Sequence, residues 1–233
     1  MTENETSQYS PLYACSMSFV ESVLSMLPKP RLVFDIGSND GGLAAWFSAR
    51  SEGVVAFEPI QSVMDKAIQS YGEDPKIEWV KNGLSDHDHS ELVGIYNCWT
   101  LTGSPAVPTD RTIEFPFDFS QEVHFITLDD AVELYGVPDF IKLDVDGYEE
   151  LVIDGGSRFF ASHLPPIMVE LSALAKIIGM RPEGALVKLY AMGYKAHSMD
   201  GSYCAETFLD AMKCFPWNSS YDVMMIHSDF KYD

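Results

Sequence analysis

The feature that most constrains this chain is the apolar run at residues 32–36, which leads directly into a turn rich in glycine and then into a helical pattern at residues 43–49. A buried strand, a glycine turn and a helix in this order are typical of an open α/β sheet, in which ligands bind at the carboxyl ends of the strands. The candidate binding residues are therefore those at the end of the strand and in the turn: Asp35, Gly37, Ser38, Asn39 and Gly41.

Short apolar runs alternate with helical patterns along the rest of the chain. The further strands predicted are residues 54–57, 77–80, 92–96, 139–145, 166–171, 194–199 and 222–226, and the further helices are residues 61–71, 148–153 and 182–192. This alternation is the signature of βαβ units, so we predict an α/β fold built on a mostly parallel sheet.

The chain of 233 residues is long enough for one α/β domain with a large core. We predict a polar N-terminal segment with a lead-in helix over residues 1–30, and one domain over residues 31–233. The interval at residues 97–121 is irregular and long for a plain connection, so it is interpreted as a lid. Its aromatic residues are candidates for an acceptor pocket: Trp99, Phe115, Phe117 and Phe119.

The charge balance argues against a nucleic-acid partner. With 15 basic and 35 acidic residues the formal charge is −20, which would repel a phosphate backbone. The four cysteines show neither zinc-site nor disulfide-framework spacing, there is no signal-peptide pattern, and no apolar run is long enough to span a membrane. We expect a soluble, cytoplasmic protein with no membrane partner; its oligomeric state is left open.

The glycine spacing separates three classes of cofactor. A dinucleotide-binding loop needs glycine where Asn39 stands, and a P-loop needs lysine where Leu43 stands, so NAD and ATP are both disfavoured. The remaining pattern, Asp-x-Gly-x-x-x-Gly, suits a ligand without phosphate. The glycines leave room, and the loop amides can hold the carboxylate of a methionyl group, which indicates S-adenosylmethionine. A plain structural turn is the alternative.

Two later segments extend this predicted site. Glu58, followed by Pro59, ends the second strand a little more than 20 residues beyond the turn, where an acid in this fold accepts hydrogen bonds from both ribose hydroxyls. The segment Gly83, Leu84 and Ser85 follows the third strand at the same edge and can take the adenine ring. A surface glutamate and a simple turn are the alternatives.

At this point the chain resembles the FkbM-type methyltransferases. The resemblance is carried by VFDIGSN (33–39), AFEP (56–59), LSD (84–86), TLDD (127–130), DFIKLDVDGYE (139–149) and MVE (168–170), in this order. It implies the class I Rossmann-like methyltransferase fold, with about seven strands flanked by helices and an antiparallel final strand. It also implies S-adenosylmethionine as cofactor and methyl transfer to hydroxyl groups, often on sugars or secondary metabolites. Asp146 departs from the glutamate that is usual in the family.

The acids near the fourth central strand are the candidates for proton removal from an acceptor hydroxyl. Asp144 comes first, beside the methionyl amine or the acceptor, followed by Asp146 and Glu170; Glu170 can instead pair with Lys142. Histidine titrates near neutrality, which makes His124 and His197 further candidates, although a lone histidine on a strand is more often structural. The three acids can collect a divalent cation, but nothing in their spacing demands a metal, and none is predicted.

Together these patterns predict an enzyme: an S-adenosylmethionine-dependent O-methyltransferase acting on a small hydroxylated molecule. Two alternatives remain open from the sequence. One is a methyltransferase-like module that binds without turnover, and the other is a nucleotide-dependent oxidoreductase on the same fold.

Overall fold

The computed structural model describes residues 17–26, 29–96, 99–101, 119–176, 179–215 and 220–230. The polar start at residues 1–16 and most of the predicted lid, with Phe115 and Phe117, lie outside the described residues. Trp99 and Phe119 lie in strands, but their side chains are not described, so the predicted aromatic acceptor pocket stays a prediction.

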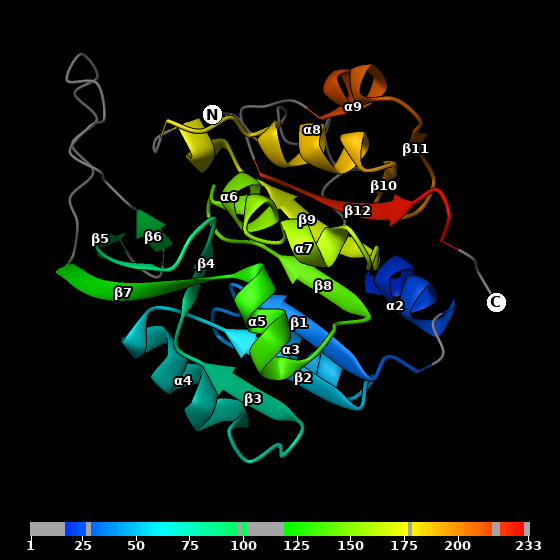
Figure 1. Ribbon diagram of the computed structural model, residues 1–233. Coiled ribbons are helices and arrows are strands. Elements are labelled where there is room, and N and C mark those ends of the chain that lie inside the picture. Colours follow the sequence, from blue (N-terminus) through cyan, green and yellow to red (C-terminus); the bar gives the residue numbers. More distant parts are fainter. Residues whose placement is uncertain are drawn as a thin grey trace, which may run out of the picture.

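The main sheet has eight strands (Figure 1). Their order is β11 (Cys204–Ala205), β10 (Tyr194–Ser198), β12 (Tyr221–His227), β9 (Ile167–Leu171), β8 (Phe140–Leu143), β1 (Leu32–Ile36), β2 (Gly53–Phe57) and β3 (Ile77–Val80). The pairs from β9 to β3 are parallel, and β12 is antiparallel to both of its neighbours. The predicted mostly parallel sheet with an antiparallel final strand is confirmed.

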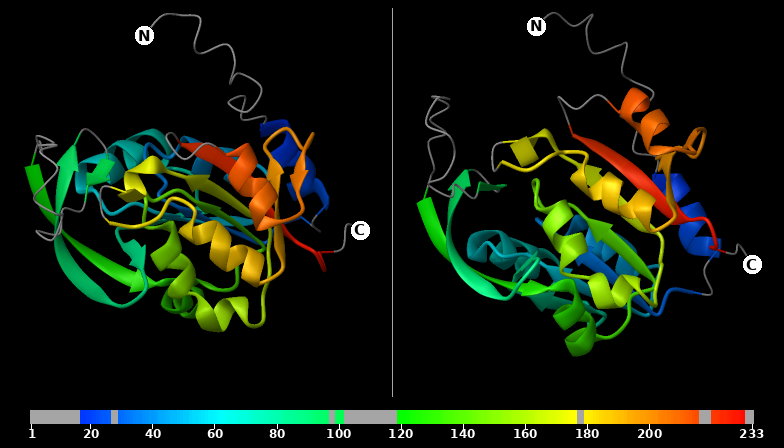
Figure 2. Two further views of the ribbon diagram at one scale, coloured as in Figure 1. Left: turned by 90° about the horizontal axis from the view of Figure 1, so that it is seen from above. Right: turned by 45° about the horizontal axis from the view of Figure 1, so that its top comes forward.

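The strands alternate their side chains between two helical layers (Figure 2). Val33 packs in one cluster with Phe47 of α3 (Gly42–Ser48) and with residues of the lead-in helix α2 (Met17–Met26). The next residue, Phe34, faces the opposite cluster. The helices on that second side are α5 (Leu128–Tyr135), α6 (Glu149–Asp154), α7 (Ser157–Phe160), α8 (Gly184–Ala191) and α9 (Phe208–Cys214). Because both faces are covered, the central strands read as continuous apolar runs.

A second sheet of four strands stands beside the first and was not predicted. Its order is β4 (Gly83–Ser85), β7 (Phe119–Thr127), β5 (His89–Tyr96) and β6 (Trp99–Leu101). The predicted strand at residues 92–96 belongs to this sheet. Val93 and Val123 pack against Val63 of α4 (Gln61–Tyr71), which anchors the sheet next to β2 and β3. Within the interval interpreted as a lid, residues 99–101 form β6 and residues 119–121 belong to β7.

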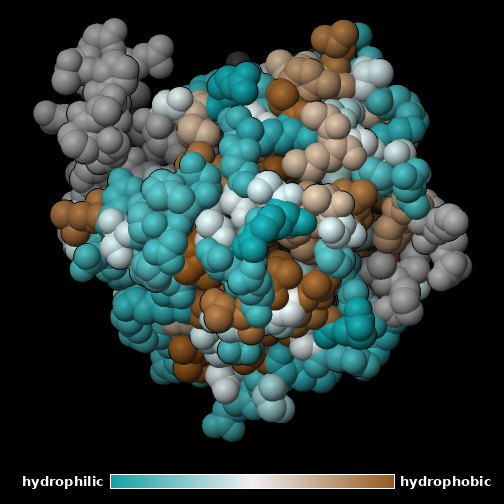
Figure 3. Space-filling model, in the orientation of Figure 1, coloured by the Kyte–Doolittle hydropathy of each residue, from teal (hydrophilic) through white to brown (hydrophobic). Residues whose placement is uncertain are grey.

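Hydrophilic side chains cover much of the face seen in Figure 3, with apolar side chains between them. Among the described residues, none of the helices has the length and the apolar character that crossing a bilayer requires.

Candidate active site

A cleft opens at the carboxyl edge of the parallel strands, with an empty volume of about 790 Å³ that includes the space at its mouth. We call it the edge cleft. Residues at the ends of β1, β2, β8 and β9 line it on one side, and residues of β4 and β7 line it on the other. Residues predicted for cofactor binding are among its lining: Gly37, Asn39, Glu58, Pro59, Gly83, Leu84 and Asp144. The predicted catalytic acids Asp146 and Glu170 line it as well.

The turn after β1 requires glycine at position 37 for two reasons. Gly37 has a φ of +81°, and a Cβ there would lie 1.7 Å from the carbonyl oxygen of Asp144. The amide of Asp144 in turn donates to the carbonyl of Ile36 at 3.0 Å. The turn and the segment after β8 are therefore in direct backbone contact, and any side chain on Gly37 would separate them.

The amides of this turn already donate within the protein. Gly37 and Ser38 donate to the carbonyl of Phe57 at 3.0 and 2.9 Å, and Asn39 donates to the Oε2 atom of Glu58 at 3.0 Å. The amides of Gly41 and Gly42 donate to the Ser38 carbonyl and to the Asp40 carboxylate. In this structure those five amides therefore already have acceptors within the protein, three of them from β2 and its terminal acid and two from the turn itself. The expectation that the loop amides hold a methionyl carboxylate stays a prediction.

Glu58 joins the two strands at the cleft. One carboxylate oxygen accepts from Asn39 and the other accepts from the amide of Ile60 at 2.8 Å. The side chain is buried, and burial raises the pKa of Glu58 to about 7. Each oxygen keeps a further lone pair. The carboxylate can therefore accept hydrogen bonds from hydroxyl groups of a ligand while it still accepts from the amide of Asn39 in the turn.

Beneath the cleft, one ammonium group is shared by three partners. The Nζ atom of Lys142 lies 2.5 Å from the Gly37 carbonyl, 3.1 Å from Asp144 and 3.5 Å from Asp35. Although burial opposes it, the attraction of Asp35 and Asp144 raises the pKa of Lys142. The ion pair expected between Lys142 and Glu170 is thus replaced by pairs with the acids of β1 and of the segment after β8.

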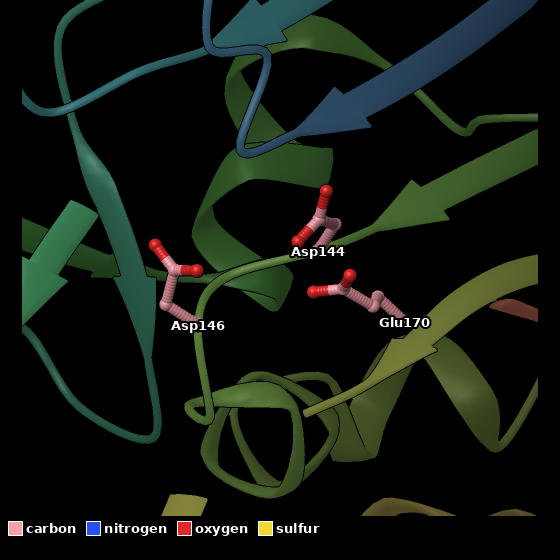
Figure 4. Close-up of side chains that lie close together, drawn as sticks. All are labelled: Asp144, Asp146 and Glu170. Atoms are coloured by element: carbon pink, nitrogen blue, oxygen red, sulfur yellow. The ribbon is translucent and has the colours of Figure 1, made fainter. Parts of the chain in front are cut away.

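Asp144, Asp146 and Glu170 converge on one point (Figure 4). Each offers one oxygen, and these oxygens all lie within 4.8 Å of one another. Burial, followed by the nearby charge of Asp144 and a hydrogen bond to it, raises the pKa of Glu170 well above its usual range. These effects favour the protonated form of Glu170, whose carboxyl group is hydrogen-bonded to Asp144. Oxygen ligands at this spacing can also hold a hard divalent cation.

Glu149 shapes the loop that carries two of these acids. Its Oε1 atom accepts from the amides of Val145 and Gly147, both at 3.1 Å. Between them Asp146 has a φ of +55°, in the left-handed region that non-glycine residues seldom adopt. The carboxylate of Glu149 thus holds this loop by its backbone. The structure places it below the loop, where it binds backbone amides.

Other predicted residues lie outside the cleft lining. Asp35 is fully buried against Lys142, Ser38 is buried in the turn, and Gly41 lies against Trp79. Ser85 is buried in β4, next to the cleft residue Leu84. The two histidines are further away: His124 is exposed on β7, 3.7 Å from Asp88, and His197 lies on β10 beside Cys204. The structure therefore does not bring either histidine to the three acids.

The cleft also contains residues that the sequence did not indicate. Ile60 and Asn82 follow β2 and β3, while Phe125 and Tyr148 form a nearly parallel pair of rings at 5.9 Å. Phe125 was missed because β7 was not predicted, and without that strand nothing in the sequence placed Phe125 at the cleft. Tyr148 was assigned to the start of a helix, and only the fold shows that this start faces the cleft.

A comparison with known protein families identifies the family of this chain. The model of the methyltransferase FkbM domain matches residues 35–196, which include the turn, Glu58, Lys142 and the three converging acids. The chain belongs to the FkbM methyltransferase family. The resemblance seen in the motifs is thereby confirmed.

Solved structures agree at the level of the fold. An FkbM methyltransferase from Methylobacillus flagellatus KT matches with a TM-score of 0.51 and 17% identity, over 94% of this chain and 48% of that one. This chain thus spans about half the length of that protein, and the likeness supports the Rossmann-like methyltransferase fold that was predicted. No curated protein matches.

Two further structures have lower TM-scores. An rRNA methylase from Streptococcus thermophilus has a TM-score of 0.48 at 11% identity, covering 91% of this chain and 94% of that one. A precorrin-6Y C5,15-methyltransferase from Geobacter metallireducens GS-15 has a TM-score of 0.47 at 13% identity, covering 89% and 86%.

Proposed function

We propose that this FkbM methyltransferase binds S-adenosylmethionine in the edge cleft and transfers its methyl group to a hydroxyl oxygen of a small acceptor. The observation that carries the proposal is that Glu58 and Asp144 face the same cleft from opposite sides of the turn at Gly37. Glu58, proposed to bind the ribose, and Asp144, proposed to act at the reacting end, are then both in contact with the turn that follows β1.

The residues present fit the adenosyl cofactor. Gly37 allows the turn to contact the backbone of Asp144, so the turn and this acid lie together at the part of the cleft where a methionyl group would bind. Glu58 would accept hydrogen bonds from the ribose hydroxyls. The side chain of Leu84 and the ring of Phe125 would pack against the adenine. Because the turn amides are engaged, the methionyl end would be held chiefly by Asp144 acting on its ammonium group.

When bound, the cofactor supplies an already activated methyl group, so the protein chiefly has to orient the acceptor and manage one proton. Asp144 is the acid proposed to take that proton. It is half-buried and faces both Lys142 and Glu170, which keep its carboxylate in place. The raised pKa of Glu170 favours its protonated form, and a protonated carboxyl group is a poor base.

The charges of the lining support a small acceptor without phosphate groups. Among the described residues, the charged side chains of the cleft lining are all acids: Glu58, Asp144, Asp146 and Glu170. Such a site, in a chain with a formal charge of −20, repels a nucleic-acid backbone. We therefore propose a neutral hydroxylated metabolite as the acceptor, with nucleic acids excluded, and a cytoplasmic location for the enzyme.

The first test measures cofactor binding. Isothermal titration of the purified enzyme with S-adenosylhomocysteine should release heat with one site per chain, and Glu58→Ala should weaken the binding. Absence of binding by the unmodified enzyme would contradict the proposed cofactor. Retention of NAD fluorescence through purification would support the oxidoreductase alternative instead.

The second test measures transfer. A panel of hydroxylated metabolites, incubated with S-adenosylmethionine, is screened for release of S-adenosylhomocysteine, with Asp144→Asn as the control. Release that depends on one acceptor and on Asp144 is expected. Tight cofactor binding together with no release from any acceptor would favour a binding module over an enzyme that turns over small hydroxylated molecules.

A further inference from the structure

Lys142 is the cation at the centre of the predicted cofactor edge, yet it does not line the edge cleft. Its side chain is 5% exposed, on the strand between β1 and β9. A charge at such a depth is costly unless good partners surround it. The three partners of Lys142 all belong to the predicted cofactor edge: Asp35 at the end of β1, the carbonyl of Gly37 in the turn, and Asp144 after β8.

Two of these contacts reach groups of the cleft lining. The side chain of Asp144 is 36% exposed and lies beside the carboxyl group of Glu170, to which it is hydrogen-bonded. The carbonyl of Gly37 belongs to a turn in a left-handed conformation. A single ammonium group bonded to that carbonyl and paired with that carboxylate keeps the two in one arrangement.

We propose that Lys142 is a positioning residue for the methionyl end of the bound cofactor, fastening the turn at Gly37 and the carboxylate of Asp144 to each other without touching the ligand. This inference rests on the proposed function. It assigns the methionyl end to the part of the cleft that Lys142 supports. It also assigns the ribose and adenine to Glu58 and Leu84, which Lys142 does not contact.

The test compares two ligands that share the nucleoside. S-adenosylhomocysteine carries the methionyl-derived tail, and adenosine lacks it. Removing Lys142 alone would leave Asp35 buried without a partner, so the informative variant is Lys142→Met combined with Asp35→Asn, measured against Asp35→Asn. A second variant combines Lys142→Met with Asp35→Leu, because an apolar pair in place of a buried ion pair is commonly well tolerated. Lys188→Met is a matched control, since Lys188 pairs with Asp154 and Glu150 away from the cleft.

In the variants, the affinity for S-adenosylhomocysteine should fall about 10-fold, the change expected when one charge-assisted contact to the site is lost. The affinity for adenosine should stay within about 2-fold, and the melting temperature should follow that of Asp35→Asn. Unchanged or tighter binding of S-adenosylhomocysteine would overturn the inference, as would equal losses for both ligands, which would mark Lys142 as support for the fold. Failure of the unmodified enzyme to bind S-adenosylhomocysteine would overturn the proposed function itself.

Discussion

Glu58 accepts the backbone amide of Asn39 at 3.0 Å, so the acid that ends the second strand is bonded to the turn that follows the first. The other oxygen of Glu58 accepts from Ile60 at 2.8 Å. The same side chain thus shapes the turn and faces the edge cleft, which ties the stability of the turn to the affinity for a ligand.

Replacing this acid should affect both properties. Glu58→Ala leaves the amides of Asn39 and Ile60 without their acceptor, which should cost about 1–3 kcal/mol in the free energy of unfolding. Loss of the ribose contact should weaken binding of S-adenosylhomocysteine by about 10-fold or more. Chemical denaturation and calorimetric titration measure the two effects. Glu52→Ala, at an exposed position before β2, is the matched control and should change neither.

Comparing Gly37 with Gly179 separates the cost of backbone strain from the cost of a steric clash. Their φ angles are +81° and +80°, but a Cβ on Gly37 would meet the Asp144 carbonyl, whereas one on Gly179 would meet nothing within 4 Å. Gly179→Ala should therefore cost about 1 kcal/mol, the penalty of a left-handed conformation alone. Gly37→Ala should cost several times as much and abolish binding of S-adenosylhomocysteine. Similar melting temperatures for the two variants would contradict the role of close backbone contact at Gly37.

Asp144→Asn should lower turnover far more than stability. The amide keeps the size of the side chain but cannot take a proton, so we expect a loss of about 100-fold in kcat once an acceptor is known. His124→Ala, which removes an exposed ring on β7, should leave turnover near that of the unmodified enzyme. If the histidine variant were the inactive one, the assignment of the base to the edge cleft would have to be abandoned.

Glu149 should make stability depend on pH. Burial raises the pKa of Glu149 to about 7 in the folded state, against 4.5 for the free side chain. The folded protein therefore binds this proton more tightly than the unfolded chain does. That contribution is complete below about pH 4.5 and is lost as the pH rises to about 7.

Glu149→Gln keeps an oxygen for the amides of Val145 and Gly147 but cannot ionise. The free energy of unfolding of the unmodified protein should fall between about pH 4.5 and 7 by roughly 3 kcal/mol more than that of the variant, at about 1.36 kcal/mol per pKa unit. Denaturation curves across this range measure the difference. If the free energy of unfolding changed with pH in the same way in both proteins, burial would not raise the pKa of Glu149 in the folded state.

The main sheet was predictable because its strands are buried on both faces and stand out as apolar runs bounded by turns. The strands at residues 32–36 and 77–80 and the helix at residues 61–71 have the predicted bounds. The second sheet was not predictable in the same way. β4 is only three residues long, and β7 follows a stretch rich in proline and glycine, so neither has enough periodic pattern to be recognised.

By itself the sequence determined that the ends of β1, β2, β8 and β9 meet at the cleft, because parallel strands in consecutive βαβ units end at one edge of the sheet. Asp144, Glu170 and Glu58 follow from that rule without any knowledge of side-chain contacts. The tertiary structure alone decided how groups at this edge compete. Lys142 pairs with Asp35 of β1 and with Asp144, and the Phe57 carbonyl of β2 accepts from the amides of Gly37 and Ser38. Such choices depend on distances and burial in three dimensions, and a linear pattern carries neither.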